Sequence, residues 1–93
     1  MLQSFADKDT ERVWKRERLR KFHPDIQRIA LRKLAILDAA ESLSDLRIPQ
    51  GNLLEKLSGN RSGQHSIRVN DQWRICFVWQ TDGAHQVEIV DYH

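Results

Sequence analysis

The sequence is most informative at residues 65–79, which read HSIRVNDQWRICFVW. Apolar and polar side chains alternate before and after residues 70–72, and this pattern predicts a β-hairpin. A three-residue turn places Arg68 directly opposite Arg74. Because like charges in opposed positions destabilise a sheet, a bound anion such as phosphate would relieve the repulsion between the two guanidinium groups.

A second hairpin is predicted next along the chain. Asp82 and Gly83 are typical of a two-residue type I′ turn, and this turn would pair Arg74 with Asp91. The period of two in a strand then places His93 on the same face as Asp91. We therefore expect one face, directed away from the helices, to carry two arginines, an aspartate and a histidine. A slip of one residue in the register would reverse this assignment.

Two cations, a carboxylate and an imidazole on one face can cleave RNA without a metal. The ribose 2′-hydroxyl attacks the adjacent phosphate, a base removes its proton, an acid protonates the leaving 5′-oxygen, and the cations stabilise the phosphorane. Histidine serves either proton-transfer role near neutral pH. The acidic residues are scattered and metal-ligand spacings are absent from the sequence, so neither a metal nor another cofactor is expected. The alternative is an ordinary ion pair between Arg74 and Asp91 beside a chain end without a role.

Helical signals fill the first half of the chain. A short edge strand is expected at residues 2–6, followed by a helix that starts near Asp7 and extends its apolar stripe to Phe22. Residues 15–21 are almost all charged and offer little apolar surface to bury. A second helix of about five turns is expected to start at Pro24, because apolar residues recur there at helical spacing.

The second half of the chain changes to strand patterns. Besides the two hairpins, residues 53–57 form a candidate strand, and loops are expected at residues 46–52 and 58–63. Helices first and strands after them indicate an α+β fold, with two N-terminal helices packed on one face of a small antiparallel sheet. At 93 residues, the whole chain (residues 1–93) is expected to be one domain.

Composition narrows the class of protein. Hydrophobic residues make up 40% and charged residues 30% of the chain, as in folded domains. Apolar runs of the roughly 20 residues needed for a membrane span are absent, the N-terminus does not have the pattern of a signal peptide, and a single cysteine, Cys76, excludes an internal disulfide. We therefore expect a cytoplasmic protein without membrane contact, in which Cys76 is a small buried hydrophobe.

The basic residues are concentrated in one block, although the net charge is only +2. Residues 12–33 contain nine lysines and arginines and only two acids, Glu17 and Asp25. Such a block binds phosphates or an acidic partner, or it is the solvated face of a helix. Charge alone leaves these alternatives open.

Three segments together resemble the HigB-type toxins of the RelE superfamily. They are residues 51–61 (GNLLEKLSGNR), 63–77 (GQHSIRVNDQWRICF) and 87–93 (VEIVDYH). The combination of WRICF with a DYH ending is specific, and the segments cover the whole strand half. The resemblance implies a RelE-like fold and a toxin that enters the ribosomal A site and cleaves mRNA there. It also implies neutralisation by a HigA-type antitoxin with a helix-turn-helix DNA-binding domain.

Two groups of site residues follow from the resemblance. The family's functional ending and the arginine of its W-R-I motif indicate as catalytic residues Arg74, Asp91, Tyr92 and His93. Nearby cations are expected to bind RNA phosphates, namely Lys56, Arg61 and Arg68. Some members carry a histidine at the position of Glu55 and a lysine at that of Ser58. Here Glu55 is a possible general base, and its alternative is an ion pair with Lys56 or Arg61.

Two other functions stay open at this point. A gyrase poison of the ParE type has the same superfamily fold but needs no acid–base residues, so the ending Asp91-Tyr92-His93 argues against it. A non-catalytic RNA- or protein-binding module would keep the basic block and the arginine pair, and it would not need His93.

Overall fold

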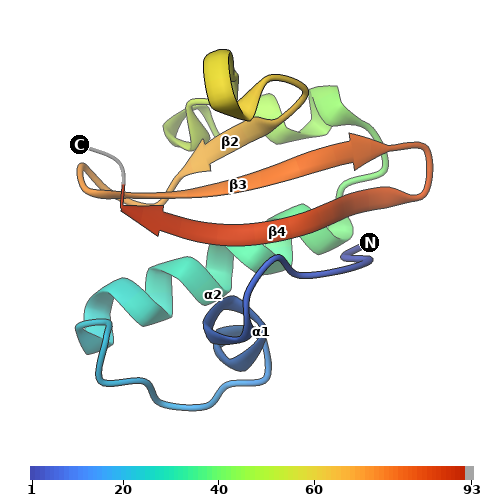
Figure 1. Cartoon of the computed structure of the whole chain (residues 1–93). Helices are drawn as coiled ribbons and strands as arrows, with labels where there is room; N and C mark the ends of the chain where they lie inside the picture. Colours follow the sequence, from blue (N-terminus) through green and yellow to red (C-terminus); the bar gives the residue numbers. More distant parts are fainter. Residues whose placement is uncertain (92–93) are drawn as a thin grey trace.

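The computed structural model describes residues 1–91 of the chain (Figure 1). Helices come first, as α1 (Lys8–Trp14) and α2 (Pro24–Ala39), and short 3-10 turns follow at Leu43–Arg47, Gln50–Asn52 and Gly59–Arg61. The strands are β1 (Glu55–Lys56), β2 (His65–Arg68), β3 (Trp73–Gln80) and β4 (Gly83–Asp91). They form one antiparallel sheet in the order β1-β2-β3-β4. The α+β prediction is confirmed.

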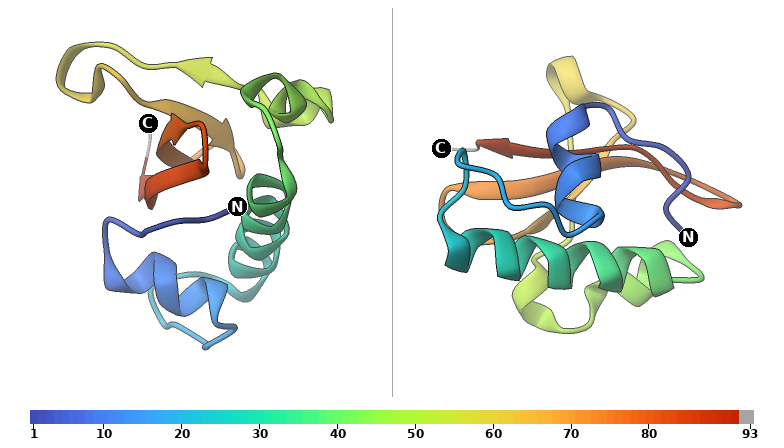
Figure 2. Two further views of the ribbon diagram at one scale, coloured as in Figure 1. Left: turned by 90° about the vertical axis from the view of Figure 1, so that its right-hand side faces the viewer. Right: turned by 90° about the horizontal axis from the view of Figure 1, so that it is seen from below.

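Both helices cover the same face of the sheet, which is seen when the molecule is viewed from below (Figure 2). The core lies between these layers. The helices contribute Val13, Leu34 and Leu37, all fully buried. The sheet contributes Ile67, Ile75, Phe77 and Val87, which are also fully buried. Apolar side chains that alternate along the strands and recur at helical spacing therefore meet in one core, as the sequence pattern predicts.

The first helix is shorter than expected. Asp7 caps it, since its carboxylate accepts a hydrogen bond from the Thr10 amide at 3.1 Å. The helix ends at Trp14, and Arg16 adopts a left-handed conformation with φ 65°. Its expected continuation towards Phe22 is wrong, because residues 15–21 have almost no apolar face to bury. Phe22 is buried all the same, with its ring 5.0 Å from that of Trp73.

The second helix begins where the sequence predicts. Pro24 occupies its first turn, and His23 caps it by accepting a hydrogen bond from the Asp25 amide at 3.1 Å.

None of the helices in residues 1–91 is both long and apolar enough to cross a membrane. Cys76 of β3 is fully buried, and burial raises the pKa of its thiol, which agrees with a packing role.

The two hairpin predictions have different outcomes. In the first hairpin Arg68 lies opposite Arg74, as predicted. In the second hairpin Gln80 pairs with Gly83, so the glycine starts β4 instead of lying in the turn. A bulge between Cys76 and Val78 then shifts the register again. The predicted pairing of Arg74 with Asp91 is therefore wrong.

The glycine at position 83 has a packing reason to lie in the strand. Its φ is 128°, and a Cβ built on it would lie 2.0 Å from the carbonyl oxygen of Met1. Only glycine lets the N-terminal segment approach β4 this closely. Asp82 and Gly83 are therefore residue types typical of a two-residue turn, but Gly83 lies in β4, where it allows the close approach of Met1.

The N-terminal segment covers the outer edge of β4. Parallel bridges join Leu2 to Ala84 and Phe5 to Val87, in place of the edge strand expected at residues 2–6. Farther along β4, the Thr10 hydroxyl accepts a hydrogen bond from the Ile89 amide at 2.9 Å. Edge amides that would otherwise invite another strand are thereby satisfied within the chain.

We expect Thr10→Val to destabilise the fold by about 1–3 kcal/mol, because the buried Ile89 amide loses its acceptor. Urea unfolding measures the loss, and hydrogen exchange at the Ile89 amide should become faster. Thr10→Ser is the control: it keeps the acceptor and loses one buried methyl, at about 0.8 kcal/mol. Equal protection of Ile89 in the valine and serine variants would contradict the proposed contact.

Candidate active site

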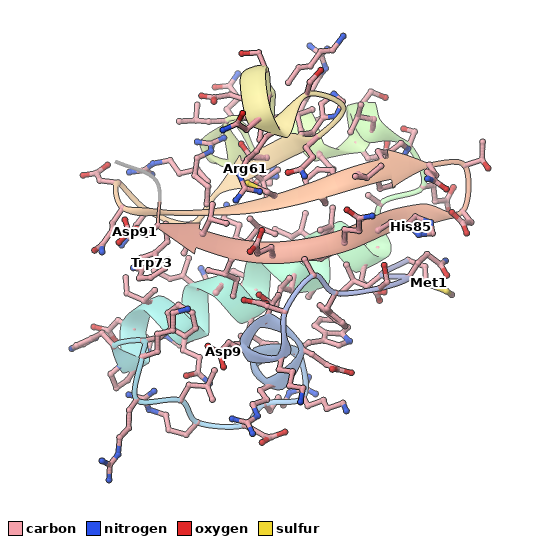
Figure 3. The ribbon with its side chains drawn as sticks, viewed as in Figure 1. Met1, Asp9, Arg61, Trp73, His85 and Asp91 are labelled. Carbon is pink, nitrogen blue, oxygen red and sulfur yellow. The ribbon has the colours of Figure 1, made fainter. Side chains whose placement is uncertain are left out.

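Charged side chains gather on the face of the sheet that points away from the helices. Strand alternation and register place there Glu55 of β1, Arg68 of β2 and Arg74 of β3. Three of the predicted site residues are therefore brought together by three neighbouring strands. Arg61, from the 3-10 turn Gly59–Arg61, lies over the same face (Figure 3).

Arg74 is the most buried of these charged residues, with 7% of its surface exposed. Its Nε donates to the Ser66 hydroxyl at 2.7 Å, and one terminal nitrogen donates to the Leu53 carbonyl at 2.5 Å and to the Ser66 carbonyl at 3.3 Å. Its other terminal nitrogen lies 3.9 Å from a carboxylate oxygen of Glu55. The guanidinium thus joins β2 and β3 to the segment that leads into β1.

Arg68 is more accessible, with 34% of its side chain exposed. It forms an ion pair with Asp71 of the first hairpin turn. The repulsion expected between Arg68 and Arg74 is therefore offset inside the chain, because each arginine has its own carboxylate partner.

Nearby Lys33 donates to the Asn52 side chain at 2.6 Å. Burial, and then the charges of Arg32 and Arg68, lower the pKa of Lys33.

Arg61 fastens the loop before β2 onto β4. One of its terminal nitrogens lies 3.1 Å from the Gln64 side-chain oxygen and 3.2 Å from a carboxylate oxygen of Glu88. Arg61 and Glu88 are each about one-third exposed. This ion pair leaves Arg61 partly accessible to an anion at the rim of the site.

Asp91 lies at the end of β4, opposite Trp73 instead of Arg74 (Figure 3). Its carboxylate accepts a hydrogen bond from the Gln72 side chain at 3.2 Å. Gln72 follows Asp71, the partner of Arg68, so β4 ends beside the turn that holds Arg68. Tyr92 and His93, both predicted as catalytic, lie outside the described residues.

Lys56 is not part of the arginine cluster. It pairs with His65 on the other face of the β1–β2 ribbon, whereas Glu55 pairs with Ser66 on the cluster's face. Lys56 is separated from Arg68 because consecutive residues of a strand point to opposite faces, and its phosphate-binding role stays a prediction. Burial, and then the charge of Lys56, lower the pKa of His65.

Some residues that build the site could not be predicted from the sequence pattern. Ser66 is fully buried and accepts the Arg74 hydrogen bond, yet a serine inside an alternating strand resembles an ordinary surface position. Asn52 is fully buried and holds Lys33, yet its neighbours resemble a simple loop. Only the register of β2 against β3 could have indicated Ser66, since it places Ser66 on the same face as Arg68.

The cluster offers two kinds of chemistry. Arginine forks suit the oxygens of a phosphate, and the Glu55 side chain, 51% exposed, is accessible to a substrate proton. Among residues 1–91, groups of three or more histidines, cysteines, aspartates and glutamates that could hold a metal ion do not occur. Phosphate binding by the arginines and proton transfer by Glu55 are the chemistry that the cluster itself can supply.

Comparisons with known proteins show the fold and the family of this chain. The solved YoeB–YefM complex from Staphylococcus aureus contains a chain of the same fold, with a TM-score of 0.63 at 16% identity, covering 100% of this chain and 98% of that one. Toxin HigB-1 from Vibrio cholerae serotype O1 is 44% identical over 94 residues, which cover 100% of this chain and 98% of the relative.

Two further matches concern parts of the chain or the family as a whole. An uncharacterised protein from Haemophilus influenzae is 34% identical over 62 residues, which cover 67% of this chain and 61% of that protein. The model of the HigB-like toxins, described as RelE-like toxins of type II toxin–antitoxin systems, matches residues 3–93. The chain therefore belongs to the HigB family of RelE-like toxins from type II toxin–antitoxin systems.

Proposed function

We propose that this toxin is an endoribonuclease that cleaves mRNA on the ribosome and thereby stops translation. The observation that carries the proposal is the cluster of Glu55, Arg68 and Arg74 on the face of the sheet not covered by helices. A phosphate held there would have cations to stabilise its developing charge and a carboxylate to accept a proton. The reaction uses the RNA 2′-hydroxyl as nucleophile and needs no metal.

We assign a different role to each of the three arginines, according to how exposed its side chain is. Arg68, one-third exposed, contacts the scissile phosphate first, and Arg61 adds charge at the rim. Arg74, almost fully buried, adds positive charge beneath the phosphate while it keeps Glu55 in place. Charge-assisted hydrogen bonds from a fixed guanidinium stabilise a transition state without reorganisation.

Proton transfer is assigned to Glu55 and to the end of the chain. Glu55 acts as the general base on the 2′-hydroxyl, and His93 acts as the general acid for the 5′-oxygen. Asp91 orients His93 or shares its proton, and Tyr92 stacks on an unpaired base. Asp91 lies opposite Trp73, on the other face from the arginine cluster, and the assignment is supported by its contact with Gln72, which follows Asp71, the partner of Arg68.

The partners follow from the family and the charge distribution. We propose a HigA-type antitoxin with a helix-turn-helix domain as the cognate inhibitor, the ribosome as the platform and the cytoplasm as the place of action. The connector after α1 has exposed basic residues, among them Arg16, Arg18 and Arg20. Such a segment suits ribosomal RNA or an acidic antitoxin segment.

A gyrase poison on the same fold and a non-catalytic binding module are the competing functions. Both would leave the proton-transfer residues without a purpose. A cleavage assay with ribosomes separates them: we expect mRNA to be cut when it is bound in programmed ribosomes and naked RNA to be cut far more slowly, because the ribosome positions the substrate. Equal rates on naked and ribosome-bound RNA would contradict the ribosome-dependent proposal.

The burial of Arg74 predicts a split between two conservative variants. Arg74→Lys should lose most of the cleavage activity and about 1–3 kcal/mol of unfolding free energy, because a lysine cannot serve Ser66 and Leu53 together. Arg68→Lys should reduce cleavage but change the unfolding free energy by no more than about 0.5 kcal/mol, as at a surface position. Urea unfolding and the ribosome assay measure both effects. If the Arg74→Lys protein is as stable as the parent, Arg74 does not position the segment that leads into β1.

The proton-transfer roles predict opposite changes in the pH–rate profile. Glu55→Gln and His93→Gln should each slow cleavage about 10²–10⁴-fold. Loss of the base should abolish the fall in rate at low pH, and loss of the acid should abolish the fall at high pH. Glu88→Gln, which alters another acid of the same face, is the matched control and should stay near the parent rate. If His93→Gln cleaves within threefold of the parent, His93 is not the acid.

A further inference from the structure

A groove of about 540 Å³ lies behind β1, on the side of the sheet opposite to the arginine cluster. Its walls come from the 3-10 turns before β1 and from the β1–β2 ribbon, and the residues that matter here are Leu43, Arg47, Leu54, Lys56 and His65. The volume is within the range of sites for small organic ligands. The assignments above leave this groove without a role.

The groove is cationic. Its lining contains Arg47 and Lys56 but no acidic residue. Across the described part of the chain, neither of these two cations lies within ion-pair distance of a carboxylate, in contrast to Arg61, Arg68 and Arg74. The acid nearest to Arg47 in sequence, Asp45, is occupied in capping, since it accepts hydrogen bonds from the Glu41 and Ser42 amides at 3.0 and 3.1 Å.

The lining of the groove contains a ring on which a flat group can stack. The imidazole of His65 stacks on Phe77, with the ring centres 6.3 Å apart and the planes at 23°. Leu43 and Leu54 pack against the hydrophobic core and are only half-buried. Burial, and then the charge of Lys56, lower the pKa of His65, which favours the neutral form of the ring as a stacking surface. In residues 1–91 its Nδ1 is the one buried side-chain polar atom without a hydrogen-bond partner.

We propose that this groove binds one nucleotide of single-stranded RNA next to the cleavage site, with its phosphate at Arg47 and Lys56 and its base on His65. The inference rests on the proposed RNA-cleaving function and extends it with a binding subsite. Bases stack on histidine as on other aromatic side chains, and two unpaired cations suit a phosphate. The neutral stacking surface favours a nucleotide over an acidic peptide, which would need charge but no ring.

The position of β1 connects the groove to the arginine cluster. β1 is the edge strand of the sheet. Its two residues, Glu55 and Lys56, are consecutive and point to opposite faces, one to the cluster and one to the groove. An RNA strand that leaves the Glu55 side and crosses this edge therefore reaches Lys56 within the width of one strand.

A titration with uncleavable RNA tests the proposal. The probes are 2′-O-methyl tetranucleotides of adenine and of uracil, added to the ¹⁵N-labelled protein. We expect chemical-shift changes at the amides of Leu54, Lys56 and His65. The double variant Arg47→Ala/Lys56→Ala should bind about 5-fold more weakly at 0.1 M salt and lower the salt slope by about 0.7, as expected for the loss of one neutralised phosphate on a single strand.

Matched variants separate this subsite from general charge and from stability. Lys8→Ala/Arg12→Ala removes the same charge from exposed positions of α1, outside both the groove and the basic connector, and should bind as the parent does. His65→Ala should weaken binding about 5- to 150-fold through lost stacking, and His65→Phe should restore most of it.

The outcomes distinguish failure of the subsite from failure of the proposed function. Parent-like binding by the Arg47→Ala/Lys56→Ala variant, or shift changes confined to the arginine cluster, would overturn the subsite. So would a tetra-glutamate peptide that shifts the groove amides while the tetranucleotides do not, because the groove would then suit an acidic protein segment. Ribosome-dependent cleavage is measured in parallel: if the parent cleaves no mRNA, the proposed function fails whatever the titration shows.

Discussion

A buried guanidinium is costly unless its donors find acceptors, and the arrangement around Arg74 satisfies this constraint. Ser66 and the Leu53 carbonyl accept its hydrogen bonds, and Glu55 lies 3.9 Å from it. β1 has only two residues, too few to hold its own place through strand pairing alone. The position of Glu55, and with it the geometry of the candidate active site, therefore depends on one side chain of the neighbouring hairpin.

The same constraint explains how two arginines can lie opposite each other. Arg68 and Arg74 do not need a bound anion to coexist, because Asp71 and Glu55 each lie beside one of them. These carboxylates are themselves 98% and 51% exposed, so water screens both pairs and weakens them. An incoming phosphate would compete with weak internal partners. The site is thus charge-balanced at rest, and its two carboxylate partners are only weakly held.

Several parts of the fold could be predicted because the local sequence patterns agree with the contacts that the folded chain makes. Asp7 and Pro24 mark both helix starts, and the alternation around residues 70–72 places Arg68 opposite Arg74. The second hairpin could not be predicted, since Gly83 is required by the approach of Met1, more than eighty residues away in sequence. One extra residue in the bulged strand then moved Asp91 to the opposite face. The arginine cluster could be anticipated, whereas Ser66 could not, because its role follows from a buried contact.

The pairing of the N-terminal segment with β4 determines when the fold can be completed during synthesis. Ser4 accepts a hydrogen bond from an amide 82 positions later, and Leu2 and Phe5 pair with the same last strand. Contacts this distant in sequence form slowly and only after both partners are synthesised. The nascent chain therefore cannot complete its sheet edge until β4 has left the exit tunnel. The fold is therefore completed by its most distant contacts, late in folding instead of early.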